Sequence, residues 1–544
     1  MKLSVVQSVD GQKARRKQLL QRRTSGSHPK RLAILVAATL TATTSTAFAD
    51  AVTDWNQYAV EATKGFEGSE STGAGVTLDT NLGTRIEAIE ARAVFDAINS
   101  IDHFSGGYYY YSANNTGNAA AAAAQAAHDV LLAELPNPVT DSTAAGWAPV
   151  RSWVDGELTT SYLSELGVAA TDPGVAAGQA AAAAAIAARA IDNSAPPGTT
   201  SAGVTYGTQL TPTTNPGTGI WRQSNAGSPY VNPVTGAPTG FDATGTVIQG
   251  KPGIDLNWRD VKPFSLPTQG VAILSRLLPL SPEVGSAEYE AELAYANQIG
   301  KDSSSVRTPD ETAQALFYKQ DAEIFVNEAA RIGSAAHGLK LDQNAALFAL
   351  LDNAVADARI GAWTSKYEQK FRRPITSANA NPDGSVTNNY VVFHPLAATP
   401  AHPSNTSGHS STGASAAEIL RAYLGDRIKS DGSPVTLGSL PWLKGTNNGT
   451  GNTTTRSVST FTQLQLETGA SRLYLGVHYG HDNFQGQLIG LEVADTILRS
   501  SDPAAAGLRI PDSPASLFNL ERTLLARRDL YGFYGNDAGR RQLY

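Results

Sequence analysis

The stretch DQNAALFALLDNAVADARIGAWTSKYEQKFR, residues 342–372, is predicted to form a long helix because residues of high helix propensity dominate it. Near its end, Lys366 and Arg373 lie seven residues apart, about two helical turns, so a helix would place both cations on one face. Trp363 shares this face, and Pro374 is predicted to end the helix. Two cations and an aromatic ring on one face suit an oxyanion, although a solvated basic face is the plainer alternative.

Helical patterns continue outward from this stretch in both directions. Further helices are predicted over residues 84–102, 118–135, 178–192, 286–300, 308–333, 412–424 and 457–500. The first three are rich in alanine, whose small side chain lets helices approach closely. Segments rich in Gly, Pro, Thr and Asn, at 193–282, 376–411 and 444–455, are predicted to be long loops. No segment sustains strand-type alternation, so the predicted fold class is mainly α, a helical bundle with long Gly/Pro-rich loops.

The N-terminus is typical of a secretory signal peptide. A strongly basic stretch is followed by an apolar, small-residue run at 32–49 that ends in Ala-Phe-Ala. A membrane anchor is the alternative, but the run is short and rich in Thr and Ser. Residues 1–49 are therefore predicted to be a signal peptide cleaved near Ala49, with export of the remainder to the periplasm or the medium. Two arginine pairs, at 15–16 and 22–23, hint at twin-arginine export.

The remaining chain is predicted to form one integrated domain. An N-terminal helical region with the Gly/Pro-rich connection spans 50–282, and a helical region carrying the candidate site spans 283–544. The length of 544 residues also allows two fused units.

Composition excludes several classes of function. The 544 residues contain no cysteine, which rules out disulfides, thiolate metal sites and cysteine nucleophiles. Removal of residues 1–49 leaves 33 basic and 48 acidic residues, a net charge of −15. Binding of nucleic acid or of an anionic membrane through bulk charge is therefore not expected, nor is stable membrane insertion. An anion site in so acidic a chain must be a local cluster of cations.

A second polar segment, HPSNTSGHSSTGASAAEILRAYL, begins at His402. Its Ser407-Gly408-His409 sequence leads into a helix predicted to start near Ser411 or Thr412. Free backbone N–H groups at such a junction bind anions, and glycine lets the backbone come close. The serine hydroxyl can donate a hydrogen bond, and the histidine can exchange a proton near neutral pH. An ordinary helix cap is the structural alternative.

The third segment, SRLYLGVHYGHD, spans Ser471 to Asp482. On the predicted helix Ser471 and His478 share a face, and Arg472, offset by about 100°, is long enough to reach it. Asp482 lies four residues after His478, where its carboxylate can orient the imidazole. His481 points elsewhere and is expected to be secondary. A salt-bridged surface face is again the alternative.

Taken together, the three segments supply three cations, free backbone N–H groups at the start of a helix, and two histidines. One of these histidines can be oriented by a carboxylate. This combination suits a tetrahedral, phosphate-like anion, with one histidine bonding the central atom and the other handling protons.

The pattern resembles the vanadium-dependent haloperoxidases and the type 2 phosphatidic acid phosphatases, over roughly residues 340–495. The matching positions are Lys366, Arg373 and Pro374; Ser407, Gly408 and His409; and Ser471, Arg472, His478 and Asp482. The family usually has proline before Ser-Gly-His, where this chain has Thr406.

The resemblance implies helical bundles with the site at a bundle end. It implies vanadate held by Lys366, Arg373, Arg472, Ser407 and the Gly408 amide, vanadium bound by His478, and acid/base catalysis by His409. Hydrogen peroxide and a halide would be the substrates, with a small organic molecule as acceptor. Relatives often pair, so a homodimer is also expected.

Two other functions stay open at this point. In an acid phosphatase, His478 would attack phosphorus, Asp482 would orient it and His409 would protonate the leaving alcohol. A phosphate- or vanadate-binding protein without catalysis is the third candidate, although it would not need two histidines and a carboxylate. The absence of several membrane spans and the length of the chain favour the peroxidase.

Two further positions concern the halide. By resemblance, His402 occupies a position where bromoperoxidases have histidine, whereas Trp363 matches the chloroperoxidase pattern. These two signals conflict, and bromide is favoured.

Overall fold

The computed structural model describes residues 50–67, 73–195, 200–201, 204–205, 221, 254–267, 280–378, 393–438 and 455–505. The predicted signal peptide and most of the 193–282 connection lie outside these residues. Among the described residues, no helix combines the length and the apolar character needed to cross a membrane.

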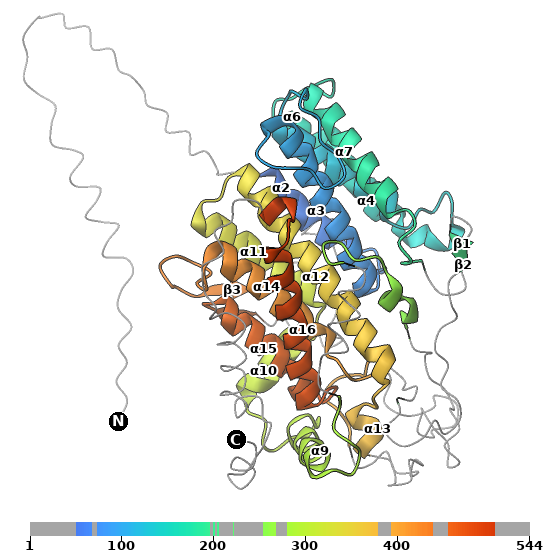
Figure 1. Cartoon of the computed structure of the whole chain (residues 1–544), viewed down its shortest axis with the longest axis vertical. Helices are drawn as coiled ribbons and strands as arrows, with labels where there is room; N and C mark the ends of the chain where they lie inside the picture. Colours follow the sequence, from blue (N-terminus) through green and yellow to red (C-terminus); the bar gives the residue numbers. More distant parts are fainter. Residues whose placement is uncertain are drawn as a thin grey trace, which may run out of the picture. The chain divides into compact units, whose positions relative to one another are not determined.

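The N-terminal region forms a group of helices around α3. Its elements are α2 (Ala51–Thr63), α3 (Thr80–Asp102), α4 (Ala119–Glu134), α5 (Ala148–Gly156), α6 (Leu163–Glu165) and α7 (Pro173–Arg189), with short 3-10 or π turns at Ser142–Trp147, Glu157–Tyr162 and Leu256–Asp260. Helices α3, α4 and α7 pack on one another, as Figure 1 shows in blue and cyan. A Cβ at Gly178 of α7 would lie 2.4 Å from the carbonyl oxygen of Ala122 of α4. The small residues therefore do permit the close helix approach that the alanine-rich sequences predict.

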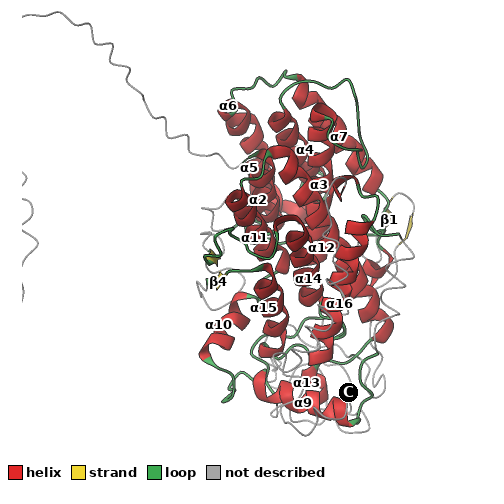
Figure 2. Cartoon of the chain, turned by 60° about the vertical axis from the view of Figure 1, so that its left-hand side comes forward, coloured by secondary structure: helices red, strands yellow, loops and turns green. Residues whose placement is uncertain are grey.

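The C-terminal region is built around α14. Its elements are α9 (Ala287–Ile299), α10 (Pro309–Phe317), α11 (Ala322–His337), α12 (Leu341–Gln369), α13 (Pro374–Ala378), α14 (Gly408–Leu424), α15 (Phe461–Tyr474) and α16 (Gly480–Arg499), followed by a 3-10 turn at Pro503–Ala505. Helix α14 packs against α11, α12, α15 and α16, and Figure 2 shows these helices side by side. Helix α12 also packs on α3, so it joins the two groups of helices.

The strands of the described residues are short. Strands β1 (Thr200–Ser201) and β2 (Val204–Thr205) form one antiparallel pair, and β3 (Val435–Leu437) and β4 (Arg456–Val458) form another. The prediction of a mainly α fold is confirmed, because helices supply nearly all of the regular structure.

The end of α12 differs from the prediction. The helix stops at Gln369 because Lys370 takes a left-handed conformation, with φ of 51°. Its N–H still bonds the carbonyl oxygen of Lys366, at 2.8 Å. Arg373 therefore lies beyond the helix, and Pro374 begins α13 instead of ending α12. A proline fits the first turn of a helix because its nitrogen needs no hydrogen-bond partner there.

Two long predicted helices are each divided. The stretch 308–333 becomes α10 and α11, and the stretch 457–500 becomes α15 and α16. The second division falls at Gly476, which has φ of +74°, a conformation open to glycine. A Cβ there would lie 2.4 Å from the carbonyl oxygen of Gly300. Close approach of the chain after α9 therefore accompanies the break.

The start of α14 also differs. The helix begins at Gly408, with Ser407 as its N-cap, three to four residues before the predicted start. The Ser407 hydroxyl accepts a hydrogen bond from the backbone N–H of Ser410, at 3.2 Å. Ser-Gly-His is thus the first turn itself rather than a loop before the helix.

Candidate functional site

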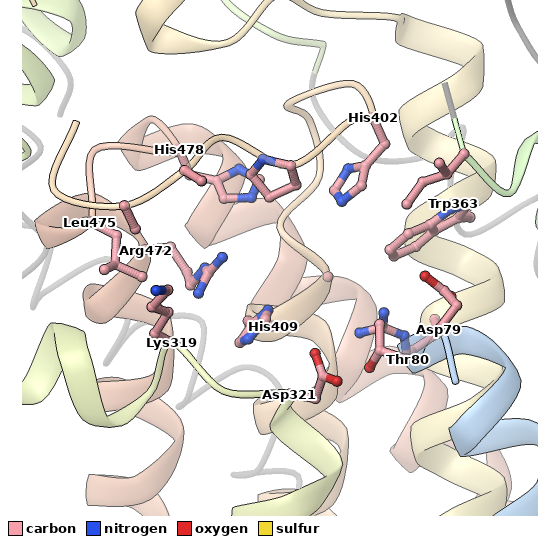
Figure 3. A pocket seen from close by; sticks show the side chains of 16 residues that line it. Asp79, Thr80, Lys319, Asp321, Trp363, His402, His409, Arg472, Leu475 and His478 are labelled. Carbon is pink, nitrogen blue, oxygen red and sulfur yellow. The ribbon is translucent and has the colours of Figure 1, made fainter. Parts of the chain in front are cut away.

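A cavity of about 240 Å³ lies where four helix ends meet. Helices α12 and α15 end here, and α14 and α16 begin here. The wall is formed by Asp79, Thr80, Ile254, Lys319, Asp321, Arg359, Trp363, Ala397, Ala398, Pro400, His402, Gly408, His409, Arg472, Leu475 and His478. Figure 3 shows Arg472 and Lys319 on one side, Asp79 and Thr80 on the other, and His409 between them.

The structure brings the three predicted segments together. Among the predicted site residues, those in the wall are Trp363, His402, Gly408, His409, Arg472 and His478. Those in the layer behind the wall are Lys366, Arg373, Ser407 and Asp482, each with none of its surface exposed. The predicted residues therefore form two layers, one facing the cavity and one supporting it.

Lys366 and Arg373 hold the loop before α14. Lys366 Nζ donates to the carbonyl oxygens of Pro403 and Ser404, at 3.0 and 3.1 Å. Arg373 Nε donates to the carbonyl oxygen of His402, at 3.0 Å. Because Arg373 lies beyond α12, the prediction that one helix face carries both cations is wrong. The folded loop brings them to the same place instead.

His478 lies in the turn between α15 and α16, not on a continuous helix as predicted. Its Nδ1 is 2.9 Å from Asp482 Oδ2, and its Nε2 is 3.0 Å from Arg373 Nη1. A guanidinium can only donate, so Nε2 accepts and the proton of the neutral ring sits on Nδ1. Burial, and next the nearby Arg373, hold the pKa of His478 well below its usual range. The ring is therefore neutral, with the lone pair on Nε2.

Asp482 is surrounded by hydrogen-bond donors. Besides His478 Nδ1, its Oδ2 accepts from Ser404 Oγ at 2.5 Å and from the Tyr479 backbone N–H at 3.1 Å. Burial alone would raise its pKa, but His481 and His478 outweigh that effect and hold the pKa well below the usual range. Asp482 is therefore a carboxylate that keeps the His478 proton on Nδ1.

His409 faces the cavity from the first turn of α14. Its Nε2 donates to the carbonyl oxygen of Gln320, at 2.9 Å, which leaves Nδ1 as the free ring nitrogen. Burial and the nearby Arg472 hold its pKa well below the usual range. The residue is a neutral imidazole whose Nδ1 can accept a proton and return it.

His402 contacts both Arg373 and Trp363. Arg373 Nη2 donates to His402 Nδ1 at 2.9 Å, and this contact is shorter than that of Nδ1 with the Pro403 carbonyl oxygen, at 3.2 Å. The arginine can only donate, so the proton of the neutral ring sits on Nε2. The rings of His402 and Trp363 are 4.9 Å apart.

Burial makes the protonated forms of the site's cations less stable. It lowers the pKa of Arg472 to about 9, with Arg373 as the next cause, and it lowers the pKa of Arg373 to about 10. Burial and then Arg373 hold the pKa of Lys366 well below its usual range. The Nε of Arg472 has no hydrogen-bond partner among the described residues. A bound anion would stabilise every one of these charges.

Sequence reasoning missed several charged and polar residues of the cavity wall. Arg359 lies seven residues before Lys366, on the same side of α12, and its guanidinium stacks 4.7 Å from the centre of the Trp363 ring. The helical spacing alone could have identified it. Asp79, Thr80 and Asp321 had no local signal, because they reach the cavity from the start of α3 and from the segment before α11.

Comparison with known proteins points to one superfamily. Residues 346–504 match the family model described as the VCPO second helical-bundle domain. A curated relative, vanadium chloroperoxidase from Curvularia inaequalis, is 27% identical over 252 residues, which span 36% of this chain and 41% of that protein. The match therefore covers less than half of the curated relative.

Solved structures extend the similarity in fold. That of the first bacterial vanadium-dependent iodoperoxidase has a TM-score of 0.59 at 17% identity, covering 82% of this chain and 95% of that chain. That of a holo-type bacterial vanadium-dependent chloroperoxidase has a TM-score of 0.56 at 16% identity, covering 78% and 93%. The resemblance to the vanadium haloperoxidase and phosphatidic acid phosphatase superfamily is confirmed, and the fold is the helical haloperoxidase fold.

Proposed function

We propose that this chain is a vanadate-dependent haloperoxidase, which uses hydrogen peroxide to oxidise a halide to hypohalous acid. The observation that carries the proposal is His478, a buried neutral imidazole with its lone pair on Nε2, beside the cations Arg373 and Lys366. The superfamily of its relatives supports the same reading.

The residues present fit vanadate. An anion would provide a partner for Arg472 Nε, which has none among the described residues. Lys366, Arg373, Arg472, Ser407 and the Gly408 amide would hold the oxygen atoms, and His478 Nε2 would bind the metal. When bound, vanadate supplies a Lewis-acid centre that activates peroxide without a change of oxidation state.

The chain's own residues then have separate tasks. Asp482 keeps the proton of His478 on Nδ1, so Nε2 keeps its lone pair, which accepts from Arg373 in this structure and would bind the metal in its place. His409 takes a proton at Nδ1 and returns it, while Gln320 holds the opposite nitrogen in place. The guanidinium groups, fixed before any substrate arrives, stabilise negative charge in a water-poor site.

The halide is proposed to be bromide. His402 presents its Nε2–H beside Trp363, which gives a polar N–H and an aromatic surface for a large, polarisable anion. The product would react with a small organic acceptor.

We also propose that the mature chain is exported after cleavage near Ala49, without membrane insertion, and that it forms a homodimer. The basic and apolar pattern of the N-terminus supports export, and the resemblance supports the homodimer.

A phosphatase is the second candidate, because the same lone pair on His478 Nε2 could attack phosphorus. A binding protein without catalysis is the third, and Asp482 and His409 would then have no task.

The test is to purify the mature chain and assay bromination with peroxide, with and without orthovanadate, beside hydrolysis of a phosphate monoester. Vanadate-dependent bromination is the expected result. Hydrolysis without any vanadate-dependent bromination would replace the peroxidase by the phosphatase. Vanadate binding with neither activity would leave the binding protein.

A further inference from the structure

A second pair of ionisable residues lies behind the site, away from the cavity. His481 Nδ1 hydrogen-bonds Glu292 Oε2, although the two residues are 189 positions apart. On its other side, His481 Nε2 lies 3.1 Å from Asp482 Oδ1. Glu292 comes from α9 and His481 from the first turn of α16. His481 does not line the cavity, but it contacts the carboxylate that orients His478.

We propose that Glu292 and His481 are positioning residues that fix the Asp482 carboxylate and, through it, the imidazole of His478. The inference rests on the proposed function, because His478 is there the residue that binds the metal.

The imidazole of His481 is fixed in orientation. It stacks on the Tyr479 ring, with the ring centres 5.2 Å apart and an interplanar angle of 15°. It also packs nearly perpendicular to the Phe371 ring, with the centres again 5.2 Å apart. The Tyr479 hydroxyl is in turn hydrogen-bonded to Ser377. The exposed fractions of Glu292 and His481 are 3% and 5%, so water does not compete for their contacts. A ring that is stacked on Tyr479 and hydrogen-bonded through Nδ1 to Glu292 has a fixed direction, and it can therefore position a neighbouring carboxylate.

The two carboxylates make His481 a cation. Burial would lower its pKa, but Glu292 and Asp482 outweigh burial and raise the pKa to about 10. A row of alternating charge follows: Glu292 negative, His481 positive and Asp482 negative. This charge attracts Asp482 Oδ1, although the 3.1 Å contact is not aligned as a hydrogen bond.

The two oxygen atoms of Asp482 have different partners, and this difference explains how Glu292 and His481 can position the carboxylate. Oδ2 accepts from Ser404, Tyr479 and His478, while Oδ1 faces His481 alone among the described residues. Without His481, Oδ1 would be a buried charge with no partner, and the carboxylate would turn to find one. Such a turn moves Oδ2 away from His478 Nδ1, and the ring loses its fixed direction.

A purely structural ion pair between α9 and α16 is the competing explanation, and a double variant separates the two. Glu292→Leu combined with His481→Phe removes both charges, keeps a ring between Tyr479 and Phe371, and leaves no unpaired charge within the pair. The matched control is Glu418→Leu with Arg421→Leu, which removes an ion pair of 2.5 Å within α14.

Two measurements are made on each protein: the Kd for orthovanadate, and the ¹⁵N spectrum of the histidine rings without vanadate. We expect the Glu292/His481 double variant to raise the Kd about tenfold, a typical loss for groups that orient a metal ligand. The His478 signals should also shift away from the pattern of an Nδ1-protonated ring. The control should keep the wild-type Kd and spectrum. Glu292→Gln, which keeps an oxygen facing His481, should retain most of the affinity and covers the case in which the double variant does not fold.

A wild-type Kd and an unchanged His478 spectrum in the double variant would overturn the positioning role and leave a structural ion pair. Failure of the wild-type protein to bind vanadate would instead overturn the proposed function. The ring spectrum without vanadate would still decide the role of the pair.

Discussion

The two walls of the cavity differ in charge, in the elements that form them, and in whether sequence patterns predict their residues. One wall comes from the ends of α12, α14 and α15 and carries Arg472, His409 and His478, all within the region that matches the family model. The other comes from the start of α3 and the segment before α11, and carries Asp79, Thr80 and Asp321. The first wall is basic and suits an anion, whereas the second is acidic.

The two walls are held by different means. The basic wall is fixed by cations that donate to loop carbonyl oxygens, as Lys366 does to Pro403. The acidic wall is fixed by the buried Lys64, which pairs with Asp321 at 2.9 Å and with the buried Glu323 at 2.5 Å. Asn81 also holds it, because it accepts from Arg359 at 2.6 Å. The difference teaches that the residues that bind the anion and the residues that shape its surroundings are separate sets. Substitutions in the basic wall should mainly weaken anion binding, and substitutions in the acidic wall should mainly lower the unfolding free energy.

The largest effect is expected from Lys64→Met in the acidic wall. The substitution leaves Asp321 and Glu323 without their shared cation, in a site where the lysine side chain is 1% exposed. Breaking a buried ion pair on one side costs about 3–5 kcal/mol of unfolding free energy. Urea unfolding would measure this loss. If Lys64→Met instead weakened vanadate binding by more kcal/mol than it lowered the unfolding free energy, the acidic wall would not act mainly through stability.

The next effect is expected from His478→Ala in the basic wall. Loss of the metal-binding nitrogen should raise the vanadate Kd at least about a hundredfold, or about 2.7 kcal/mol, because loss of groups that only orient a ligand already costs up to that much. Vanadium content after gel filtration is the measurement. Stoichiometric retention of vanadium by the variant would remove His478 from its proposed role.

A smaller effect is expected from Gly408→Ala, where α14 meets α12. A Cβ at this position would lie 2.9 Å from Trp363 Cζ3 and 3.5 Å from Arg359 Nη1. Overpacking of this kind costs about 1–3 kcal/mol, and it should also weaken vanadate binding by moving the first turn of α14. Thermal unfolding and the vanadate Kd measure the two losses. Adding Trp363→Phe makes room for the methyl group and should restore part of both. A double variant no better than Gly408→Ala would show that the contact is not the cause.

The smallest effect over one pH unit concerns His481. Its pKa is about 10 when folded and about 6.5 when unfolded, so its contribution is complete below pH 6.5 and is lost as the pH rises toward 10. Between pH 7.5 and 8.5 the unfolding free energy should therefore fall by at most about 1.4 kcal/mol more in the wild type than in the Glu292→Leu/His481→Phe variant. Urea unfolding at both values measures this. Parallel pH profiles would mean that His481 is not a cation in the folded protein.

Much of the basic wall could be predicted from the sequence. Spacing within short segments identified His409, Arg472, His478 and Asp482, and helical periodicity gave the mainly α class. The directions of the side chains were less well predicted. Arg373 was placed on α12 and His478 on a continuous helix, because periodicity assumes that a helix continues until a strong breaker appears. The breaks at Lys370 and Gly476 depend on left-handed conformations that no strong local signal announces.

The sequence by itself therefore determined the helical class and the chemical groups of the basic wall, since both follow from residues close together in the chain. Only the tertiary structure decided which ring nitrogen of each histidine carries the proton, because that choice depends on distant partners such as Gln320 for His409. It also decided that Asp79 and Asp321 complete the cavity and that Glu292 meets His481. Such pairs are fixed by the packing of helices far apart in the chain, and local spacing carries no information about them.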